Sequence, residues 1–588
     1  MSHSSARHLP MTAEECRLRG WDAVDVVLVT GDGYIDHPSF GVALIGRLLE
    51  SKGYRVAVLS QPHHDSAVDF YRFGRPRLFF GITAGNLDSI VANYTGNGKV
   101  RDFDAYSSAG NPWRSDLQSK INRKRPDRAT ITYANLARAA YNDVPIILGG
   151  IEASLRRFIH YDYKQNRLRS SVLTDGKADL LIYGMAEKGI VAVAAALAQE
   201  RIPTGIKGCC ERLTESRFSE LQGTLTPETS IILPSWNDIQ KDKGLFLEAE
   251  LLIDQHARSG SDKMLVQQQQ SNWVIQHPAP AILSEEELDE LYDLPFQRTP
   301  HPGAGDIPAY RMIRHSATIV RGCSGNCSFC AITRHQGPTI SSRSRASILR
   351  EVRKITIMSD FFGTISDLGG PTANLYGSSC TIGGCKRHEC LYPKVCEHLK
   401  VNEEKMIGLL KDVAALDEVK HVFISSGLRM ELLLKTPRLL EKLITSHTPG
   451  SLKIAPEHSD DNILKIMHKE SHDILRQFVK QCGMIAQKQK KKVQLTPYVI
   501  TGHPGSTEKS ALQLVDTFKK LELPIRQFQD FTPTPGTLST AMFVSGLDRD
   551  RKKIIIPSAS QRSRQRAHLE TAFHKRSLRQ SKKRPGKK

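Results

Sequence analysis

Hydrophobic runs alternate with amphipathic stretches through the first 220 residues. Five short apolar runs have the length of buried strands: 25–30, 55–60, 78–82, 145–148 and 180–183. Stretches such as 42–50 and 187–201 instead repeat apolar residues at helical spacing. Continuous apolar strands that alternate with helices are typical of a parallel sheet covered on both faces. The pattern predicts an α/β domain over residues 1–225.

The alternation of strand and helix resumes near residue 316 and repeats six times. The predicted strands are 316–321, 363–368, 421–425, 452–455, 493–500 and 526–531. Helical patterns lie between them, for example 346–357 and a run capped by Thr436 with Pro437 in its first turn. We expect this second α/β domain to cover 303–548. Six such units are fewer than the eight of a closed βα barrel.

The segment 226–302 between the two domains has a weaker pattern. It contains the glutamine run 267–270, a proline-rich stretch, and a helix start in which Ser284 and Glu287 form a capping box. The large side chains of Trp273, Tyr292 and Phe296 would anchor it. We expect an ordered bridge rather than a free linker.

The net charge of +20 is concentrated at the C-terminus. Residues 551–588 hold fourteen Lys and Arg against a single acid, Glu570, and thus carry +13. Such blocks are usually solvated and disordered, and sometimes contact RNA. We expect 549–588 to be a disordered tail, with weak RNA contact as the alternative.

Cys323, Cys327 and Cys330 form a C-x3-C-x2-C run directly after the first strand of the second domain. Cysteine thiolates are the usual ligands of iron–sulfur clusters, and three thiols leave one iron of a 4Fe–4S cube free for another ligand. Zinc sites normally show four ligands in paired C-x2–4-C units. The odd count therefore favours a cluster over zinc or a disulfide.

This run, with Phe329 before its last cysteine, resembles the motif of radical S-adenosylmethionine (SAM) enzymes. Seven blocks in order are similar to the YgiQ family of radical SAM proteins: GDGYIDHPSFG, LGGIEASLRRF, RGCSGNCSFC, DLGGPTAN, LKIAPEH, TGHPGST and FTPTPGTLSTAM. The resemblance covers about residues 25–542. It implies a Rossmann-like N-terminal domain of the cobalamin-binding type, followed by a partial (βα)6 TIM-like radical SAM barrel.

The resemblance also implies the cofactors, a 4Fe–4S cluster and SAM, and a low-potential electron donor of the flavodoxin or ferredoxin type. Phe329, Gly369 and Gly370 would line the SAM site, although Pro371 stands where the superfamily has a glutamate, and Asp367 would have to replace it. Asp36 and His37 are adjacent rather than spaced as D-x-H-x-x-G, so we do not expect His37 to bind cobalt.

Polar residues follow the third and fourth strands of the second domain as well. Arg429 suits the carboxylate of SAM, because a guanidinium binds carboxylates with two parallel hydrogen bonds. Glu457 and His458 would serve either in proton transfer or as a cap of the next helix. These two interpretations remain open.

A second group of cysteines has the spacing C-x4-C-x4-C-x5-C, with histidines at 388 and 398; its members are Cys380, Cys385, Cys390 and Cys396. Four thiolates suit an auxiliary iron–sulfur cluster or a structural zinc ion, and reduced thiols on a loop are the third interpretation. We expect a metal here without choosing its identity.

These observations predict an enzyme that cleaves SAM to a 5′-deoxyadenosyl radical, which acts on an unknown substrate. The alternatives are a methylthiotransferase-like modifier of RNA or protein and a non-catalytic, RNA-associated iron–sulfur protein. The longest apolar runs are shorter than the roughly 18–20 residues that span a bilayer, and the N-terminus lacks the apolar core of a secretory signal. The eleven cysteines, an odd number and mostly clustered, favour a reducing compartment, and we therefore expect a cytoplasmic protein without membrane contact.

Overall fold

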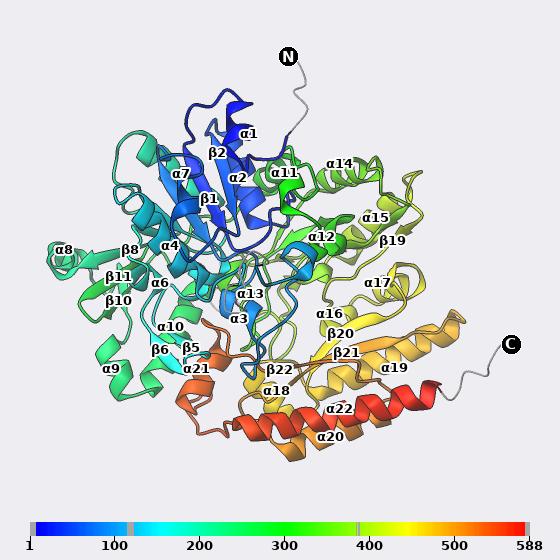
Figure 1. The fold of residues 1–588 in the computed structure, drawn as a ribbon. Helices are drawn as coiled ribbons and strands as arrows, with labels where there is room; N and C mark the ends of the chain where they lie inside the picture. Colours follow the sequence, from blue (N-terminus) through cyan, green and yellow to red (C-terminus); the bar gives the residue numbers. More distant parts are fainter. Residues whose placement is uncertain (1–6, 115–122, 384, 386–388, 582–588) are drawn as a thin grey trace. The chain divides into compact units, whose positions relative to one another are not determined.

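The computed structural model describes residues 7–114, 123–383, 385 and 389–581 (Figure 1). The chain forms two compact units. Unit 1 comprises Met1–Arg314, Arg334–Gly337 and Thr534–Gly536; unit 2 comprises His315–Thr333, Pro338–Pro533 and Thr537–Lys588. None of the helices among the described residues combines the length and the apolar character needed to cross a bilayer.

The described residues of unit 1 form a nine-stranded sheet. In sheet order its strands are β2 (Val56–Ser60), β1 (Val26–Thr30), β3 (Phe79–Thr83), β4 (Ile146–Leu148), β7 (Leu180–Ile182), β8 (Cys209–Thr214), β11 (Asn272–Gln276), β10 (Met264–Gln269) and β9 (Ser230–Ile232). The first five are parallel, and β8 joins β7 in the antiparallel sense. The five predicted strands are therefore confirmed as one parallel layer.

Successive side chains of a strand point to opposite faces of the sheet, and helices bury both faces of the parallel strands. Val26 and Leu28 of β1 pack with α2 (Gly41–Ser51) and α7 (Glu187–Ala198) in one apolar cluster. Val27 and Val29 pack with α4 (Ala129–Ala140) and α6 (Val172–Asp175) in another. This two-sided burial explains the continuous apolar runs of the sequence. The order β2-β1-β3-β4-β7 is that of a doubly wound, Rossmann-like fold, as predicted.

The segment 226–302 is ordered, but it does not form a separate bridge. It supplies β9, β10 and β11 to the sheet of unit 1, which extends to Arg314. The glutamine run is strand β10, in which Gln267 and Gln269 are buried. Their side-chain oxygens accept the backbone N–H groups of Ile159 (3.0 Å) and Ser171 (2.8 Å). The polar composition of this run did not predict a core strand. Its glutamine side chains can be buried because they are hydrogen-bonded to buried backbone groups.

Unit 2 contains the six predicted strands in chain order. They are β12 (Ser316–Thr318) with β13 (Val320–Arg321), β15 (Thr364–Ile365) with β16 (Asp367–Gly369), β19 (His421–Val422), β20 (Leu452–Glu457), β21 (Leu495–Thr501) and β22 (Gln527–Asp530). The pairs β12–β16, β15–β19, β20–β21 and β21–β22 are all parallel. The first two predicted strands are each split in two. The arrangement agrees with an open, partial (βα)6 barrel.

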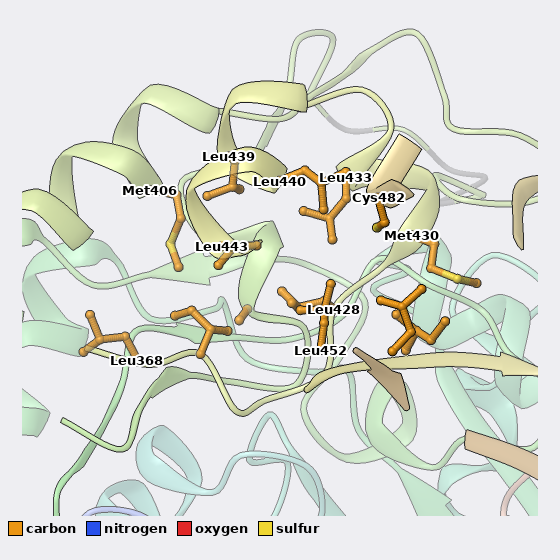
Figure 2. Packing of buried hydrophobic residues seen from close by; sticks show 14 of the residues in the cluster. Leu368, Met406, Leu428, Met430, Leu433, Leu439, Leu440, Leu443, Leu452 and Cys482 are labelled. Carbon is orange, nitrogen blue, oxygen red and sulfur yellow. The ribbon is translucent and has the colours of Figure 1, made fainter. Parts of the chain in front are cut away.

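Helices between the strands bury the core of unit 2. The main ones are α14 (Arg345–Thr356), α15 (Glu403–Ala414), α17 (Pro437–Lys442), α19 (His472–Lys488) and α20 (Glu508–Lys520). Figure 2 shows part of the resulting cluster, in which Met406, Leu440 and Leu443 from the helices pack with Leu368 and Leu452 from the strands. The core holds the strands, and the loops that follow them carry the site.

The tail expected to be disordered contains a helix, α22 (Ala559–Ser581). Leu569 is completely buried and belongs to the core of unit 2. Gln565 is also buried, and its side-chain oxygen accepts from the backbone N–H of Gly502 and from Ser506 Oγ, both at 3.0 Å. For the described residues the expectation failed because the prediction used the net charge of the whole segment, whereas Gln565 and Leu569, one helical turn apart, are buried in unit 2.

Candidate functional site

The three cysteines of the C-x3-C-x2-C run lie on the loop after β13, at the end of the first strand of unit 2. Cys323 is buried, and Cys327 and Cys330 are half-buried. The N–H of Ser328 donates to the carbonyl of Met467 (2.9 Å), and the N–H of Cys330 donates to the carbonyl of Cys327 (3.1 Å). Chemistry at the carboxyl end of a strand is the rule in βα barrels.

Arg429, which follows the third strand, approaches this loop. Its Nη2 donates to Cys327 Sγ (3.3 Å), and Cys323 Sγ lies 3.4 Å from the hydroxyl of Thr372. A Cβ on Gly325 would lie 1.8 Å from Arg429 Nη2. The glycine between the first two cysteines is therefore what lets the guanidinium reach the sulfur.

The sulfur environment disfavours free thiolates. Burial raises the pKa of Cys327, although Arg429 and Lys469 oppose the shift. Burial and the neighbouring Cys327 raise the pKa of Cys330 to about 12. Without a metal these two thiols hold their protons at neutral pH, so metal binding would release protons.

A cluster of buried charges surrounds Arg429. Arg429 Nη1 donates to Glu431 Oε1 (3.2 Å), and Lys469 Nζ lies 3.0 Å from Glu470 Oε2. Burial, with the charge of Glu470, raises the pKa of Glu431. Burial acts in the same direction on Glu470, but Lys469 and Arg429 outweigh it, so the pKa of Glu470 is lowered. Buried charges of both signs, paired in this way, provide fixed electrostatics beside the cysteines.

Glu457 belongs to the same neighbourhood, at the end of β20. Its backbone has φ of +63°, which is uncommon for a residue other than glycine and is often found at functional sites. Burial raises the pKa of Glu457 to about 7, with Lys469 opposing the shift. A carboxyl that titrates near neutral pH can donate or accept a proton. His458, the next residue, has its pKa lowered to about 4 by burial, and its Nδ1 accepts from the N–H of Asp460 (3.0 Å).

The two glycines after the second strand are required by close packing. A Cβ on Gly369 would lie 2.0 Å from Ser426 Oγ, and one on Gly370 would lie 2.4 Å from the carbonyl oxygen of Val320. Asp367 is already engaged, because its Oδ1 accepts from Ser425 N (2.8 Å) and Ser426 N (3.1 Å), and its Oδ2 accepts from the Ser426 hydroxyl. Asp367 therefore positions the loop that follows β19. Because its oxygens are occupied in this way, it is a poor substitute for the glutamate that Pro371 replaces.

Phe329 and His503 lie in an apolar part of the same unit. Phe329 packs against a cluster that includes Met467, Ile500 and Phe531. The ring of His503 is 6.4 Å from that of Phe329 and nearly perpendicular to it. Burial lowers the pKa of His503 to about 3, and its ring nitrogens are within hydrogen-bond distance of the Pro504 carbonyl (2.8 Å) and Ser539 Oγ (2.7 Å). His503 is thus a structural residue.

The second cysteine group lies between β16 and α15. Cys380 is exposed, and Cys385, Cys390 and Cys396 are half-buried; all eleven cysteines of the chain are free thiols. His388 lies outside the described residues. Within the described part of the chain, no three or more His, Cys, Asp or Glu side chains are arranged to hold one metal ion. This applies to both cysteine groups.

In unit 1, His37 is buried as a structural residue. Its Nδ1 accepts from the N–H of Ser39 (3.1 Å), and its Nε2 lies 2.8 Å from Arg298 Nη2. Burial and the charge of Arg298 lower the pKa of His37 well below its usual value. Both ring nitrogens of His37 therefore have protein partners.

Side chains also fill the crevice at which doubly wound sheets usually bind ligands, between β1 and β3. Asp32 after β1 pairs with the buried Arg125 (2.5 Å) and accepts from the N–H of Asn86 (2.7 Å). A Cβ on Gly85, after β3, would lie 2.2 Å from the Asp32 carboxylate. Asp32 therefore contacts both Arg125 and the segment after β3 directly.

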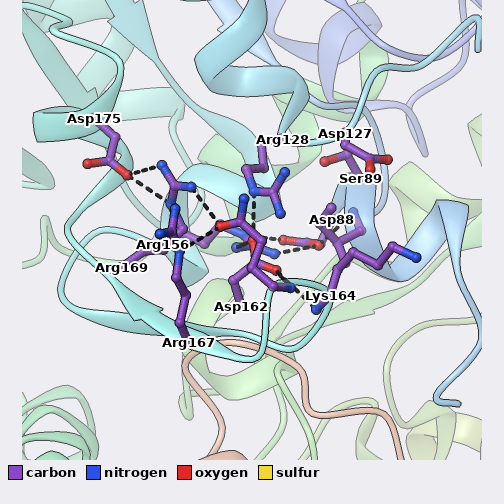
Figure 3. A network of polar contacts seen from close by, with 12 residues as sticks. Asp88, Ser89, Asp127, Arg128, Arg156, Asp162, Lys164, Arg167, Arg169 and Asp175 are labelled. Carbon is purple, nitrogen blue, oxygen red and sulfur yellow. Dashed lines mark hydrogen bonds and ion pairs between the residues drawn. The ribbon is translucent and has the colours of Figure 1, made fainter. Parts of the chain in front are cut away.

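A neighbouring network of buried charges is shown in Figure 3. Asp88 caps α3 (Ser89–Asn93) and accepts two hydrogen bonds from Arg156, at 2.6 and 3.0 Å. Asp162 accepts from Arg128 (2.7 Å). These pairs join segments that are far apart in sequence, and they fix the loops at the strand ends of unit 1.

Sequence analysis missed several residues of the site in unit 2. Lys469 and Glu470 lie between α18 (Asp461–Met467) and α19, and two adjacent charges in a short turn are normally solvated. Thr372 and Asn326 lie inside the blocks DLGGPTAN and RGCSGNCSFC, but the contacts of their side chains could not be predicted from these motifs. Only the packing of the unit reveals them.

Comparisons with known proteins agree with the motifs. The family profile described as "Radical SAM N-terminal" matches residues 8–316, and that of the "Radical SAM superfamily" matches residues 318–518. A "UPF0313 protein" of Thermotoga maritima is 44% identical over 550 residues, which cover 92% of this chain and 94% of the relative. A UPF0313 protein of Geobacter sulfurreducens is 42% identical over 548 residues, with coverage of 92% and 88%.

A solved structure resembles the fold of this chain. It is the radical S-adenosylmethionine methyltransferase TsrM from Kitasatospora setae with cobalamin and a 4Fe–4S cluster bound, with a TM-score of 0.52. The similarity covers 94% of this chain and 91% of that one at 13% sequence identity. At this identity the likeness concerns the fold alone.

Proposed function

The chain belongs to the radical SAM superfamily and to the family of UPF0313 proteins, and from this membership we propose that Cys323, Cys327 and Cys330 hold a 4Fe–4S cluster that binds SAM. The finer assignment that we infer is the YgiQ type, which the seven sequence blocks support. When bound, such a cluster supplies the electron that cleaves SAM to a 5′-deoxyadenosyl radical. The protein is then an enzyme whose substrate is unknown.

The donor set of the loop fits this cofactor. Three thiols from one loop leave an iron free for a non-protein ligand. Arg429 donates a hydrogen bond to Cys327 Sγ, and hydrogen bonds to cluster sulfurs raise the reduction potential. The contact between Arg429 and the cysteine loop is the observation that carries the proposal, because it aims a fixed positive charge at the sulfur of a predicted ligand.

The remaining residues would bind SAM and exclude water. We place Phe329, Gly369 and Gly370 along the SAM site, where the glycines let the backbone approach a ligand. The charges of bound SAM would be compensated by buried side chains: its carboxylate by Arg429 and Lys469, and its sulfonium and ammonium by the buried acids beside them. Glu457, with its pKa near 7, would hold or release one proton at neutral pH.

Anaerobic reconstitution tests the proposal. The reconstituted protein, given dithionite and SAM, should release 5′-deoxyadenosine and contain about four irons in the loop's cluster. Cys327→Ala should abolish the release and lose these irons. Cys482→Ala, which alters a buried cysteine of α19 in the same unit, is the matched control and should retain both. Equal release of 5′-deoxyadenosine by the Cys327 variant would refute the assignment.

Two related proposals follow. Reduction needs a one-electron donor, and we infer a flavodoxin or ferredoxin. A methylthiotransferase-like reaction on RNA or protein is the second candidate, and the second cysteine group favours it. Weak RNA contact through the C-terminal segment stays a prediction; among its described basic residues, Arg564 pairs with Glu508 and Arg566 with Asp530.

A further inference from the structure

The described residues between 379 and 400 (379–383, 385 and 389–400) are here called the cysteine lobe, and paired strands lie at its two ends. The strands β17 (Ser379–Cys380) and β18 (Leu399–Lys400) pair in the antiparallel sense, with Cys380 opposite Leu399. The N–H of Thr381 donates to the carbonyl of His398 (2.9 Å). Within the lobe, the N–H of Cys396 donates to the carbonyl of Cys390 (2.8 Å). The pairing places Cys380 beside Leu399, whose N–H donates to the carbonyl of Cys396 (3.2 Å).

Cys390 is half-buried and lies close enough to Cys396, Cys380 and Cys385 to interact with each of them electrostatically. Four thiols that share a small region repel one another once ionised, and a bound cation removes that repulsion.

The lobe is fastened to the loop that carries Cys323, Cys327 and Cys330. Glu389 Oε1 accepts from Asn326 Nδ2 (3.2 Å), and the ring of Tyr392 lies 3.8 Å from that of His468. His468 in turn has its Nδ1 3.0 Å from the carbonyl oxygen of Asn326. The stretch 389–392 therefore contacts the middle of the three-cysteine loop, both directly and through one histidine.

An apolar cluster provides a second connection. Cys323 and Leu391 are among its buried members, and Cys390 is partly buried against it. One thiol of each group thus contacts the same small core. Such a core keeps water from the space between the two groups, and it favours low-polarity surroundings for a metal centre.

We propose that Cys380, Cys385, Cys390 and Cys396 bind a second iron–sulfur cluster next to the three-cysteine loop. Four thiolates complete the ligation of a cube, so this cluster has no open iron and binds no SAM. The spacing lacks the C-x2-C pairs of structural zinc sites, which favours a cluster. A closed cluster takes up and passes on one electron at a time, and the reductant would be the low-potential donor protein of the proposed function. The site itself does not depend on that function.

Iron and acid-labile sulfide in the full-length, anaerobically reconstituted protein test this. We expect about eight irons per chain, about four in a variant with Cys323, Cys327 and Cys330 all changed to Ala, and about four in Cys390→Ser/Cys396→Ser. The reduced triple variant should show a cluster signal in electron paramagnetic resonance that SAM does not change. Cys482→Ser serves as control and should keep about eight.

Other results would overturn the inference. One such result is about four irons in the unmodified protein and none in the triple variant. Another is one zinc per chain that remains in the triple variant and is lost in Cys390→Ser/Cys396→Ser. If the three-cysteine loop bound no cluster, the unmodified protein and the triple variant would contain equal amounts of iron. That pattern would refute the proposed function and leave the second site supported. Circular dichroism shows whether each variant has folded. If Cys390→Ser/Cys396→Ser has not folded, Cys380→Ser, which changes the exposed cysteine of the same group, takes its place.

Discussion

At the scale of single residues, the glycine at 325 and Arg429 act together. The guanidinium reaches Cys327 Sγ only because residue 325 has no side chain. Arg429→Lys keeps the positive charge, but the lysine side chain is shorter and lacks the planar guanidinium that donates to Cys327 Sγ. We expect the reduction potential of the first cluster to fall by roughly 40 mV, or ~1 kcal/mol for one electron, because a hydrogen bond to sulfur stabilises the reduced state.

Redox titration followed by electron paramagnetic resonance measures this shift. Arg438→Lys is the matched control, since Arg438 pairs with Glu404 on the surface and should leave the potential unchanged. A potential for Arg429→Lys that equals that of the control would show that the hydrogen bond to sulfur has no influence on the cluster.

Glu457 makes stability depend on pH. Its pKa is raised from 4.5 to about 7 by burial, so the folded protein holds a proton that the unfolded chain has released between these values. The free energy of unfolding therefore falls as pH rises through this window, by up to about 3 kcal/mol. Glu457→Gln removes the dependence, and it should be the more stable protein at pH 8 and equal at pH 4.5.

Urea unfolding of the metal-free protein at several pH values gives these free energies. Glu404→Gln, at an exposed position of the same unit, should follow the unmodified protein at every pH. If Glu457→Gln gained nothing at pH 8 over pH 4.5, the buried carboxyl would not be the group responsible.

At the scale of elements, α22 is part of the core of unit 2. Leu569→Ala removes a completely buried side chain and should lower the free energy of unfolding by about 2–5 kcal/mol. Arg564→Ala on the same helix removes only a surface pair with Glu508 and should cost less than about 1 kcal/mol. Equal losses in urea unfolding would mean that α22 does not pack as described.

The elements that sequence could predict are those whose burial is local and continuous. The strands β1 to β4 and β7 were predicted to within one or two residues, because both of their faces are apolar. β10 was missed because Gln267 and Gln269 are buried by partners more than 90 residues away. The same distinction holds in the site: the cysteines form one compact motif, whereas the burial of Lys469 and Glu470 depends on contacts from other elements.

At the scale of the whole molecule, each unit has a hydrophobic core of its own. We expect two transitions in calorimetry of the metal-free protein. Asp88→Asn breaks the buried pair with Arg156 in unit 1. It should lower the free energy of unfolding of that unit by about 3–5 kcal/mol, and with it the midpoint temperature of one transition. Leu569→Ala should lower the other. Asp143→Asn, which alters an exposed pair with Arg75, should move neither. A single transition shifted by both core variants would contradict this independence.

The division of the chain has a consequence for its synthesis. Unit 1 includes Thr534–Gly536, so its last segment leaves the ribosome only when nearly all of the 588 residues have been translated. Domains usually complete their fold in order of emergence. The apolar clusters of unit 1 are built from residues that precede Arg314, so this core can be buried during elongation, and Thr534–Gly536 joins a unit that has already formed.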